Sequence, residues 1–213
     1  MTRRTRSIRH AVTVVAATGI ALLTSCGSSP RLHSADGSNP GFPTPQLTSR
    51  VVAGHCDGQI GAHSVDGDVT VEDGGICELL GTRVEGNVSV GHSARLYVSG
   101  VDVDGDIEGE RARAVEVTHG SRVGGNVQLE SGNVVVIADS HIHGDLSLQH
   151  QHGKLLIRDN TVSGNAEIED NTGGAIVSHN VIHGDLSCQD NTRSPAGGDN
   201  AVAGDRTDQC HAL

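Results

Sequence analysis

The chain has 213 residues, of which 29 are glycine and only 1% are aromatic, so it lacks the Phe, Trp and Tyr side chains of a conventional globular core. Val, Ile, Leu and Ala must fill the interior, and these β-branched and small side chains suit narrow, layered coils. The formal net charge of −11 argues against nucleic acid as a partner, because nucleic acids bind basic surfaces.

Residues 1–25 are predicted to be an export signal. Arginines near the start precede an apolar stretch from Ala11 to Leu23, which is too short to span a bilayer comfortably. The segment carries four of the 15 basic side chains and none of the 26 acidic ones, so the remainder has a formal net charge of −15. Such a body would not be drawn to lipid headgroups.

The end of this segment resembles the bacterial lipobox. In Leu23-Thr24-Ser25-Cys26 a cysteine directly follows the apolar stretch, and the resemblance implies cleavage before Cys26 once its thiol carries fatty acids such as palmitate. Two or more acyl chains would make this membrane attachment stable. We therefore expect an exported protein, lipid-anchored at the outer face of the bacterial cell membrane. An ordinary secretory signal with a chance cysteine and a twin-arginine signal are the alternatives.

Residues 26–49 are predicted to form a disordered or extended tether that begins at the lipidated Cys26. Four of the five prolines lie here, among glycines and serines that interrupt any hydrophobic periodicity. A folded domain is expected over residues 50–213.

This domain is built on a repeated phrase: an apolar residue, any residue, Gly, Asp or Asn, and then alternating apolar residues. Successive copies are 19 or 20 residues apart, which is typical of stacked repeat folds. The alternation predicts a strand in each phrase, and a second short strand precedes each next copy. The repeat glycines are Gly67, Gly86, Gly105, Gly125, Gly144, Gly164, Gly184 and Gly204.

Strands that return at this spacing without helical spacers should stack as parallel sheets. Parallel crossovers are overwhelmingly right-handed, and the variable period does not fit the strict six-residue repeat of left-handed β-helices. The sequence therefore predicts an all-β, right-handed parallel β-helix of about seven to eight coils. A left-handed helix or another all-β solenoid is the alternative.

Polar residues recur in register with the repeat. Asn160, Asn180 and Asn200 fall four residues before a repeat glycine, and Ser140 and Ser121 continue roughly the same column. We expect an amide ladder along the stack, with a polar binding row as the alternative. For the repeat glycines we expect positive φ, with the following Asp or Asn bonded to nearby backbone.

Four cysteines remain once Cys26 is lipidated, and an exported chain with an even number should form disulfides. Separations of 21 and 22 residues place Cys56 next to Cys77 and Cys188 next to Cys210 on adjacent coils, so we predict these two pairs among three connectivities. Each would staple one end of the solenoid. Four thiolates around zinc would require the two ends to meet.

Two family resemblances follow from these motifs. Residues 160–210, with DN-x-V-x-GN, HN-x-I-x-GDLSC-x-DN, GDN-x-V-x-GD and QC, are similar to the C-terminal repeats of secreted and lipid-anchored β-helical proteins of actinobacteria, most of unassigned function. The V-x-G-[DN]-V-x-V phrase over residues 65–205 is distantly similar to bactofilins, which are polymerising β-helical cytoskeletal proteins. These resemblances imply a fold and disulfides rather than an activity.

Two side-chain clusters are candidate sites. The alternating acids from Asp102 to Glu110, followed by Arg111 and Arg113, are predicted to share one outward face, where they could hold calcium or cleave an acidic polysaccharide. The same row also describes a solvated strand edge. Histidine pairs that could bind a transition metal are predicted at 141 and 143, at 150 and 152, and at 143 and 183 one coil apart.

No nucleophile triad or phosphate loop stands out, and we expect no catalytic residue, no cofactor and no resident metal. The favoured function is a non-catalytic cell-envelope lipoprotein, monomeric, whose rigid acidic β-helix serves a structural role or binds an envelope glycan or protein. The main alternative is a surface-anchored carbohydrate-active enzyme acting on polysaccharide, and a third is an inert polymerising solenoid.

Overall fold

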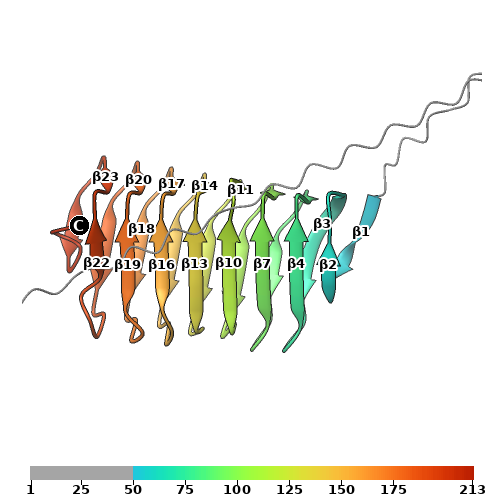
Figure 1. The fold of residues 1–213 in the computed structure, drawn as a ribbon, viewed down its shortest axis with the longest axis horizontal. Coiled ribbons are helices and arrows are strands. Elements are labelled where there is room, and N and C mark those ends of the chain that lie inside the picture. Colours follow the sequence, from blue (N-terminus) through green and yellow to red (C-terminus); the bar gives the residue numbers. More distant parts are fainter. Residues whose placement is uncertain (1–49) are drawn as a thin grey trace, which may run out of the picture. The chain divides into compact units, whose positions relative to one another are not determined.

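A computed structural model describes residues 50–213, with side chains described from Gly54 onward. The regular elements of residues 50–213 are all strands. They stack into a solenoid of about eight coils, as the repeat predicts (Figure 1). The predicted signal and tether, residues 1–49, lie outside the described residues.

One side of the solenoid is an eight-stranded parallel sheet, which receives one strand from each coil. Its strands are β2 (Gly58–Ile60), β4 (Ile76–Leu80), β7 (Arg95–Ser99), β10 (Ala114–Thr118), β13 (Val134–Ala138), β16 (Leu155–Arg158), β19 (Ala175–Ser178) and β22 (Ala196–Gly198).

The second sheet covers two further sides and also pairs its strands in parallel. We call its first part the short row: β5 (Arg83–Val84), β8 (Asp102–Val103), β11 (Ser121–Val123), β14 (Ser140–Ile142), β17 (Thr161–Val162), β20 (Val181–Ile182) and β23 (Ala201–Val202). We call its second part the long row: β6 (Val88–Val90), β9 (Ile107–Glu110), β12 (Val127–Glu130), β15 (Leu146–Gln149), β18 (Ala166–Glu169), β21 (Leu186–Gln189) and β24 (Arg206–Asp208).

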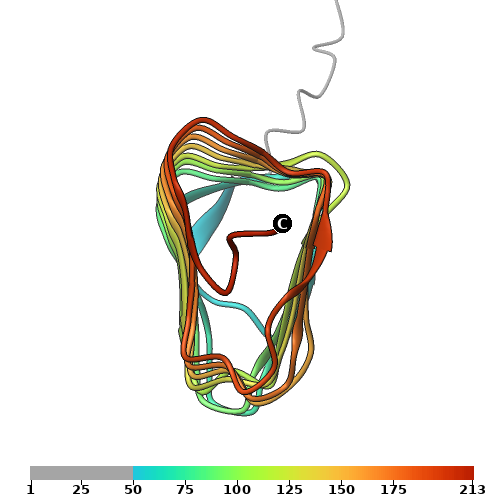
Figure 2. The ribbon, with the colours of Figure 1, turned by 90° about the vertical axis from the view of Figure 1, so that its left-hand side faces the viewer.

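In the first coil the two rows are one continuous strand, β3 (Ser64–Val71), which pairs with β5, with β6 and with β1 (Arg50–His55). From β5 onward a bend at the repeat glycine separates the rows, so each later coil has three sides (Figure 2). In Figure 1 the eight-stranded sheet runs upward on the near side, the chain passes over the top into the short row, and each coil lies to the left of its predecessor. The solenoid is therefore right-handed.

The core is a set of stacked columns of Val, Ile, Leu and Ala. The apolar residues that the alternation assigns to the interior are buried, for example Val65, Val84 and Val103, which occupy one column. Each fully buried side chain of this size contributes about 1.5–3 kcal/mol. Because every coil covers its neighbours, aromatic residues are not needed to close the core.

Both corners next to the eight-stranded sheet carry a buried polar row. At the upper corner, Asn160 Nδ2 donates to Asn180 Oδ1 at 3.0 Å, and Asn180 Nδ2 donates to Asn200 Oδ1 at 2.9 Å. Ser140 continues the row, since its backbone N–H donates to Asn160 Oδ1 at 3.1 Å. This confirms the expected amide ladder.

The residue before each asparagine explains why the ladder is needed. Asp159, His179 and Asp199 have φ of 57°, in the left-handed region, and they precede Asn160, Asn180 and Asn200. This turn interrupts strand pairing, so the backbone N–H of the asparagine donates instead to the amide oxygen of the asparagine on the following coil.

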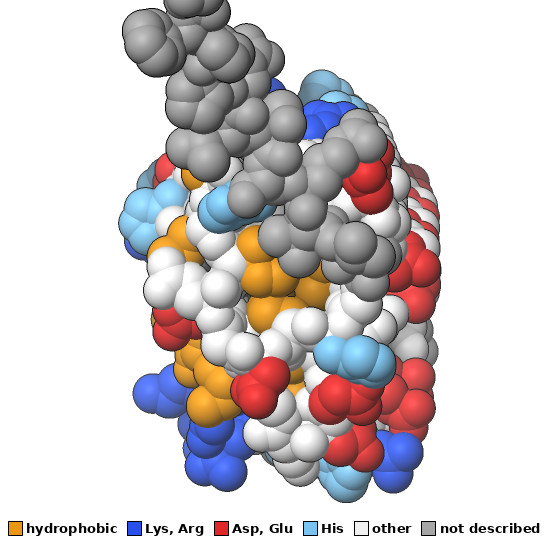
Figure 3. All heavy atoms as spheres, turned by 90° about the vertical axis from the view of Figure 1, so that its right-hand side faces the viewer, with side chains coloured by type: hydrophobic (Ala, Val, Ile, Leu, Met, Phe, Trp, Pro, Cys, Tyr) orange, Lys and Arg blue, Asp and Glu red, His pale blue; other side chains and the backbone are white. Residues whose placement is uncertain are grey.

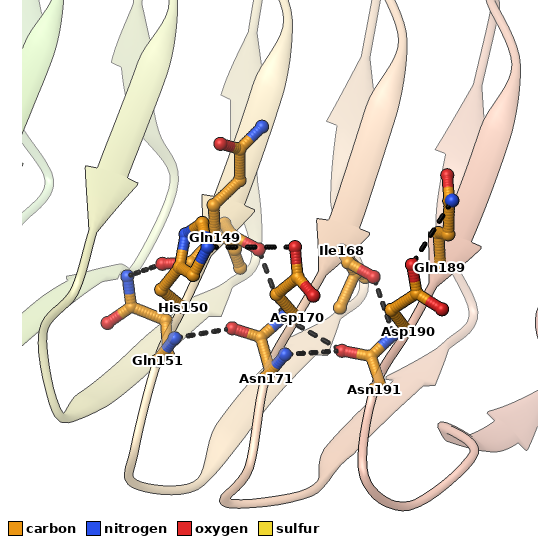
Figure 4. Close-up of polar contacts among 10 residues, drawn as sticks. Gln149, His150, Gln151, Ile168, Asp170, Asn171, Gln189, Asp190 and Asn191 are labelled. Carbon is orange, nitrogen blue, oxygen red and sulfur yellow. Dashed lines mark hydrogen bonds and ion pairs between the residues drawn. The ribbon is translucent and has the colours of Figure 1, made fainter.

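A second ladder, which the sequence reasoning missed, lies at the lower corner (Figure 4). The Gln151 backbone N–H donates to Asn171 Oδ1 at 2.7 Å, and Asn171 Nδ2 donates to Asn191 Oδ1 at 3.0 Å. Gln209 closes the row by accepting from Asn191 Nδ2 at 3.0 Å. The available signal was the Asp-Asn pair that recurs at 170 and 190, twenty residues apart.

The repeat glycines serve a purpose different from the one expected. Among the eight, only Gly67 has positive φ, 104°, so the expectation of a left-handed turn is wrong for the other seven. A Cβ on Gly105 would overlap Asn87 Oδ1 of the preceding coil and lie 2.9 Å from the Gly86 carbonyl oxygen. Glycine is therefore required by the close approach of a side chain one coil away.

That side chain belongs to what we call the Asp/Asn row, the residues that follow the repeat glycines. Each side chain except the last accepts the backbone N–H of its equivalent on the next coil, in seven hydrogen bonds of 2.6–2.9 Å. The expectation of a bond to nearby backbone is therefore wrong, because the partner lies 19 or 20 positions further along the chain. The row consists of Asp68, Asn87, Asp106, Asn126, Asp145, Asn165, Asp185 and Asp205.

Candidate functional site

The cysteines are paired as the sequence predicts, one pair at each end of the solenoid. Cys56 and Cys77 form a disulfide with a Cα–Cα distance of 5.5 Å, and Cys188 and Cys210 form another at 5.1 Å. All four are buried, and the segment after β24 folds across the last coil, with Leu213 packed against the core (Figure 2). Two disulfides fit an extracellular protein.

Cys26, the predicted lipidation site, lies outside the described residues. Residues 50–213 include no helix that is both long and apolar enough to cross a membrane.

The predicted acidic row does not lie on one face. Asp102 is in β8 of the short row, Glu108 and Glu110 are in β9 of the long row, and the bend between the rows separates them. Individual acids also have other partners: Asp104 pairs with Arg83 at 2.6 Å, and Glu110 with Arg111 at 2.9 Å. Asp106 Oδ1 accepts the Asn126 N–H at 2.6 Å. The alternation persists through the bend, but the outward direction changes there.

The long row does form an acidic face. Its Asp and Glu side chains lie along the right-hand edge of the molecule in Figure 3. A shallow hollow of about 580 Å³ lies on this face over Gly109, lined in part by Glu108, Glu110 and Glu130. Gly109 takes the inward position that Val90 and Leu129 occupy on the neighbouring coils.

Further along this face, Glu167 lies among like charges. Partial burial raises the pKa of the Glu167 carboxyl above its usual value, and the negative charges of Glu169 and Asp145 raise it further. In the part of the chain that the structure describes, no three His, Cys, Asp or Glu side chains come together in an arrangement that could hold a metal ion.

The histidine pairs are only partly as expected. His141 in β14 and His143 just after it are both exposed on the short-row side, as predicted. His183 lies two coils from His143, because Ser163 occupies the intervening position, so the expected neighbouring pair is wrong. His150 and His152 lie in the lower corner rather than on a strand, and His150 faces Asp170 at 3.6 Å.

The short-row side brings together a set that the sequence reasoning did not connect: Arg122, His141, His143, Thr161 and Ser163 line a hollow of about 420 Å³. These residues come from three successive coils, and those on different coils are 18 to 41 positions apart, so no local motif joins the three coils. The signal that could have found them is the 19- to 20-residue register itself.

Comparisons of the chain with protein-family models, with curated proteins and with solved structures find no match.

Proposed function

We propose that this chain is an exported, non-catalytic protein of the bacterial cell envelope, anchored by a lipid on Cys26 at the outer face of the cell membrane. Its β-helix would be a monomeric, rigid acidic body outside the membrane, with a structural role or a role in binding an envelope glycan or protein. The observation that carries the proposal is the pair of disulfides in the end coils, because such bonds persist in oxidising compartments outside the cytosol.

Two sequence features support the anchoring part of the proposal. The apolar stretch ending in Leu23-Thr24-Ser25-Cys26 has the anatomy of a lipoprotein signal. The resemblance of residues 160–210 to lipid-anchored actinobacterial β-helical proteins points the same way. The more distant resemblance to bactofilins supports a solenoid but comes from a cytoplasmic setting, and the stapled ends argue against the end-to-end polymerisation of those proteins.

Metabolic labelling with palmitate tests the anchor. The full chain, produced in a bacterium, should incorporate label and enter the detergent phase on phase separation, and Cys26→Ser should abolish both. A Cys56→Ser and Cys77→Ser double variant is the matched control, because it removes thiols elsewhere and should retain the label. Label that survives Cys26→Ser would contradict the proposed anchor.

The alternative function is a surface-anchored carbohydrate-active enzyme, and the hollow over Gly109 is the observation that favours it. Three glutamates line this hollow, and carboxylates are the groups that commonly cleave glycosidic bonds. Incubating the oxidised full chain with a panel of envelope and extracellular polysaccharides, with and without calcium, would separate the two functions. Shortened glycans would establish an enzyme, whereas retention of intact glycans would establish a binding protein.

A further inference from the structure

The short row places two columns of outward-facing residues side by side. In register, Arg122 lies between Asp102 on the coil before and His141 on the coil after, and His141 is followed by Thr161. The second column lies two residues further along each coil and consists of Asp104, Gly124, His143 and Ser163. Since neighbouring strands are about 4.8 Å apart, side chains from consecutive coils can reach one ligand group together.

Gly124 lies in the middle of this surface, in close contact with the preceding coil. A Cβ at this position would overlap the Asp104 carbonyl oxygen, so the close approach of two coils requires glycine here. A hollow of about 200 Å³ includes Gly124, and it shares Arg122 and His143 with the larger hollow of about 420 Å³. The two hollows thus form adjoining depressions, with Arg122 and His143 at their shared border.

Most of these donors have no partner within residues 50–213. Arg122 forms no ion pair there. Of the two acids that line the smaller hollow with it, Asp104 is engaged at both carboxylate oxygens by Arg83 at 2.6 and 3.0 Å. His141, Thr161 and Ser163 likewise form no side-chain hydrogen bond in this part of the chain. His143 Nδ1 lies 3.3 Å from the Val123 carbonyl oxygen, which leaves Nε2 uncommitted.

Three other arginines of residues 50–213, Arg83, Arg111 and Arg158, are paired with carboxylates. Arg111 and Arg158 each pair with the carboxylate of an adjacent residue, at 2.9 and 2.7 Å. Figure 3 shows Lys or Arg and His side chains next to each other at the upper rim, with Asp and Glu side chains close by. On a chain of net charge −11, a guanidinium with neighbouring imidazoles and hydroxyls is a local site for negative charge.

We propose that this hollow binds a single oxyanion, a carboxylate or phosphate group. The Arg122 guanidinium offers the two parallel N–H groups that suit a carboxylate or phosphate. His141, His143, Thr161 and Ser163 supply further donors around the same opening. Asp102 and Asp104 at one side restrict the ligand to one anionic group at this position and disfavour a dense polyanion. The proposal does not depend on a lipid at Cys26.

Calorimetric titration of the oxidised full chain tests this site with ligands that share one ring: glucose, glucuronate and glucose 6-phosphate, with inorganic phosphate as a fourth arm. At least one oxyanion should bind and neutral glucose should not. Binding of glucuronate alone would identify the carboxylate as the group recognised. Binding of the phosphates alone, or of both kinds, would identify phosphate or the shared oxyanion chemistry.

Arg122→Gln should weaken oxyanion binding about tenfold or more, as expected for loss of a charged hydrogen-bond donor. Arg113→Gln is the matched control, because it removes the same charge from an exposed residue in the lower corner and should change affinity by less than about twofold. Thr161→Val should weaken binding about two- to tenfold. Thermal unfolding of each variant verifies that the fold is kept. The proposal is overturned if no oxyanion binds, if glucose binds equally well, or if Arg122→Gln and Arg113→Gln have equal effects.

Discussion

Gly144 illustrates how a single atom can decide the fit between coils. An added Cβ would overlap Asn126 Oδ1 and lie 2.7 Å from the Gly125 carbonyl oxygen, while the φ of Gly144 is ordinary. The space beside its Cα is therefore occupied by the acceptor that fixes the next coil, since Asn126 Oδ1 binds the Asp145 N–H at 2.8 Å.

Gly144→Ala is therefore expected to lower the free energy of unfolding by about 1–3 kcal/mol, the usual cost of overpacking. Gly61→Ala is the control, because its nearest neighbour would be 3.9 Å away and its φ is not positive, so the change should stay within about 0.5 kcal/mol. Urea unfolding measures both, and equal effects would contradict the steric explanation.

The ionised Glu167 carboxylate lowers the free energy of unfolding by an amount that depends on pH. Because burial and the charges of Glu169 and Asp145 raise its pKa in the folded chain, the folded state holds this proton more tightly than the unfolded chain does. The free energy of unfolding should fall as pH rises from the ordinary carboxyl pKa through the raised one.

Glu167→Gln removes the unfavourable charge, so the variant should be more stable than the parent at pH 7. The difference in the free energy of unfolding should shrink as pH falls below the ordinary carboxyl range. Thermal unfolding from pH 3 to pH 8 measures it. Ser187→Ala, at the equivalent position on the next coil, should show no such pH trend, and a gain for Glu167→Gln that is independent of pH would rule out the electrostatic cause.

At the scale of strands and corners, the polar rows behave as elements in their own right. Asn180 donates to the Ile157 carbonyl and to Asn200, and its Oδ1 accepts both the N–H and the side chain of Asn160. It is only 1% exposed, so water cannot replace these partners.

Asn180→Ala should therefore cost about 2 kcal/mol or more, because it leaves buried groups on two coils without partners. Ser178→Ala, two residues earlier and without a side-chain hydrogen bond in the described chain, should cost less than about 0.5 kcal/mol. Hydrogen exchange at the Asn160 amide should accelerate only in the first variant, and unchanged protection would contradict the ladder's role.

These rows also mark how far sequence alone could predict the structure. The period of 19 or 20 residues is enough to assign the interior columns, the upper asparagine row and the cysteine pairs, because each depends only on register. It does not locate the bends, since alternation continues through them, and so the acids from Asp102 to Glu110 seemed to share one face. The role of the repeat glycines and the site at Arg122 depend on contacts between coils, which no single repeat contains.

At the scale of the molecule, each coil contacts only its neighbours, so stability is distributed along the axis rather than concentrated in one centre. The end coils have one neighbour each, and there the disulfides replace part of the missing contact.

Removing the Cys188–Cys210 disulfide by a double change to serine is expected to cost about 2–4 kcal/mol locally. Hydrogen exchange should accelerate in β21 and β24, whereas β10 and β13 near the middle should keep their protection. The matched double change at Cys56 and Cys77 should affect the first coils instead. Loss of protection throughout either variant would show that the solenoid unfolds as one cooperative unit.

The Asp/Asn row has a last consequence for how such a molecule can change in length. From Asp68 to Asp185 carboxylate and amide alternate strictly, which keeps like charges two coils apart, about 9.6 Å rather than 4.8 Å. Duplicating or deleting one interior coil would set two carboxylates or two amides against each other. The smallest insertion that preserves the alternation is a pair of coils, so the unit of growth is twice the unit of repetition.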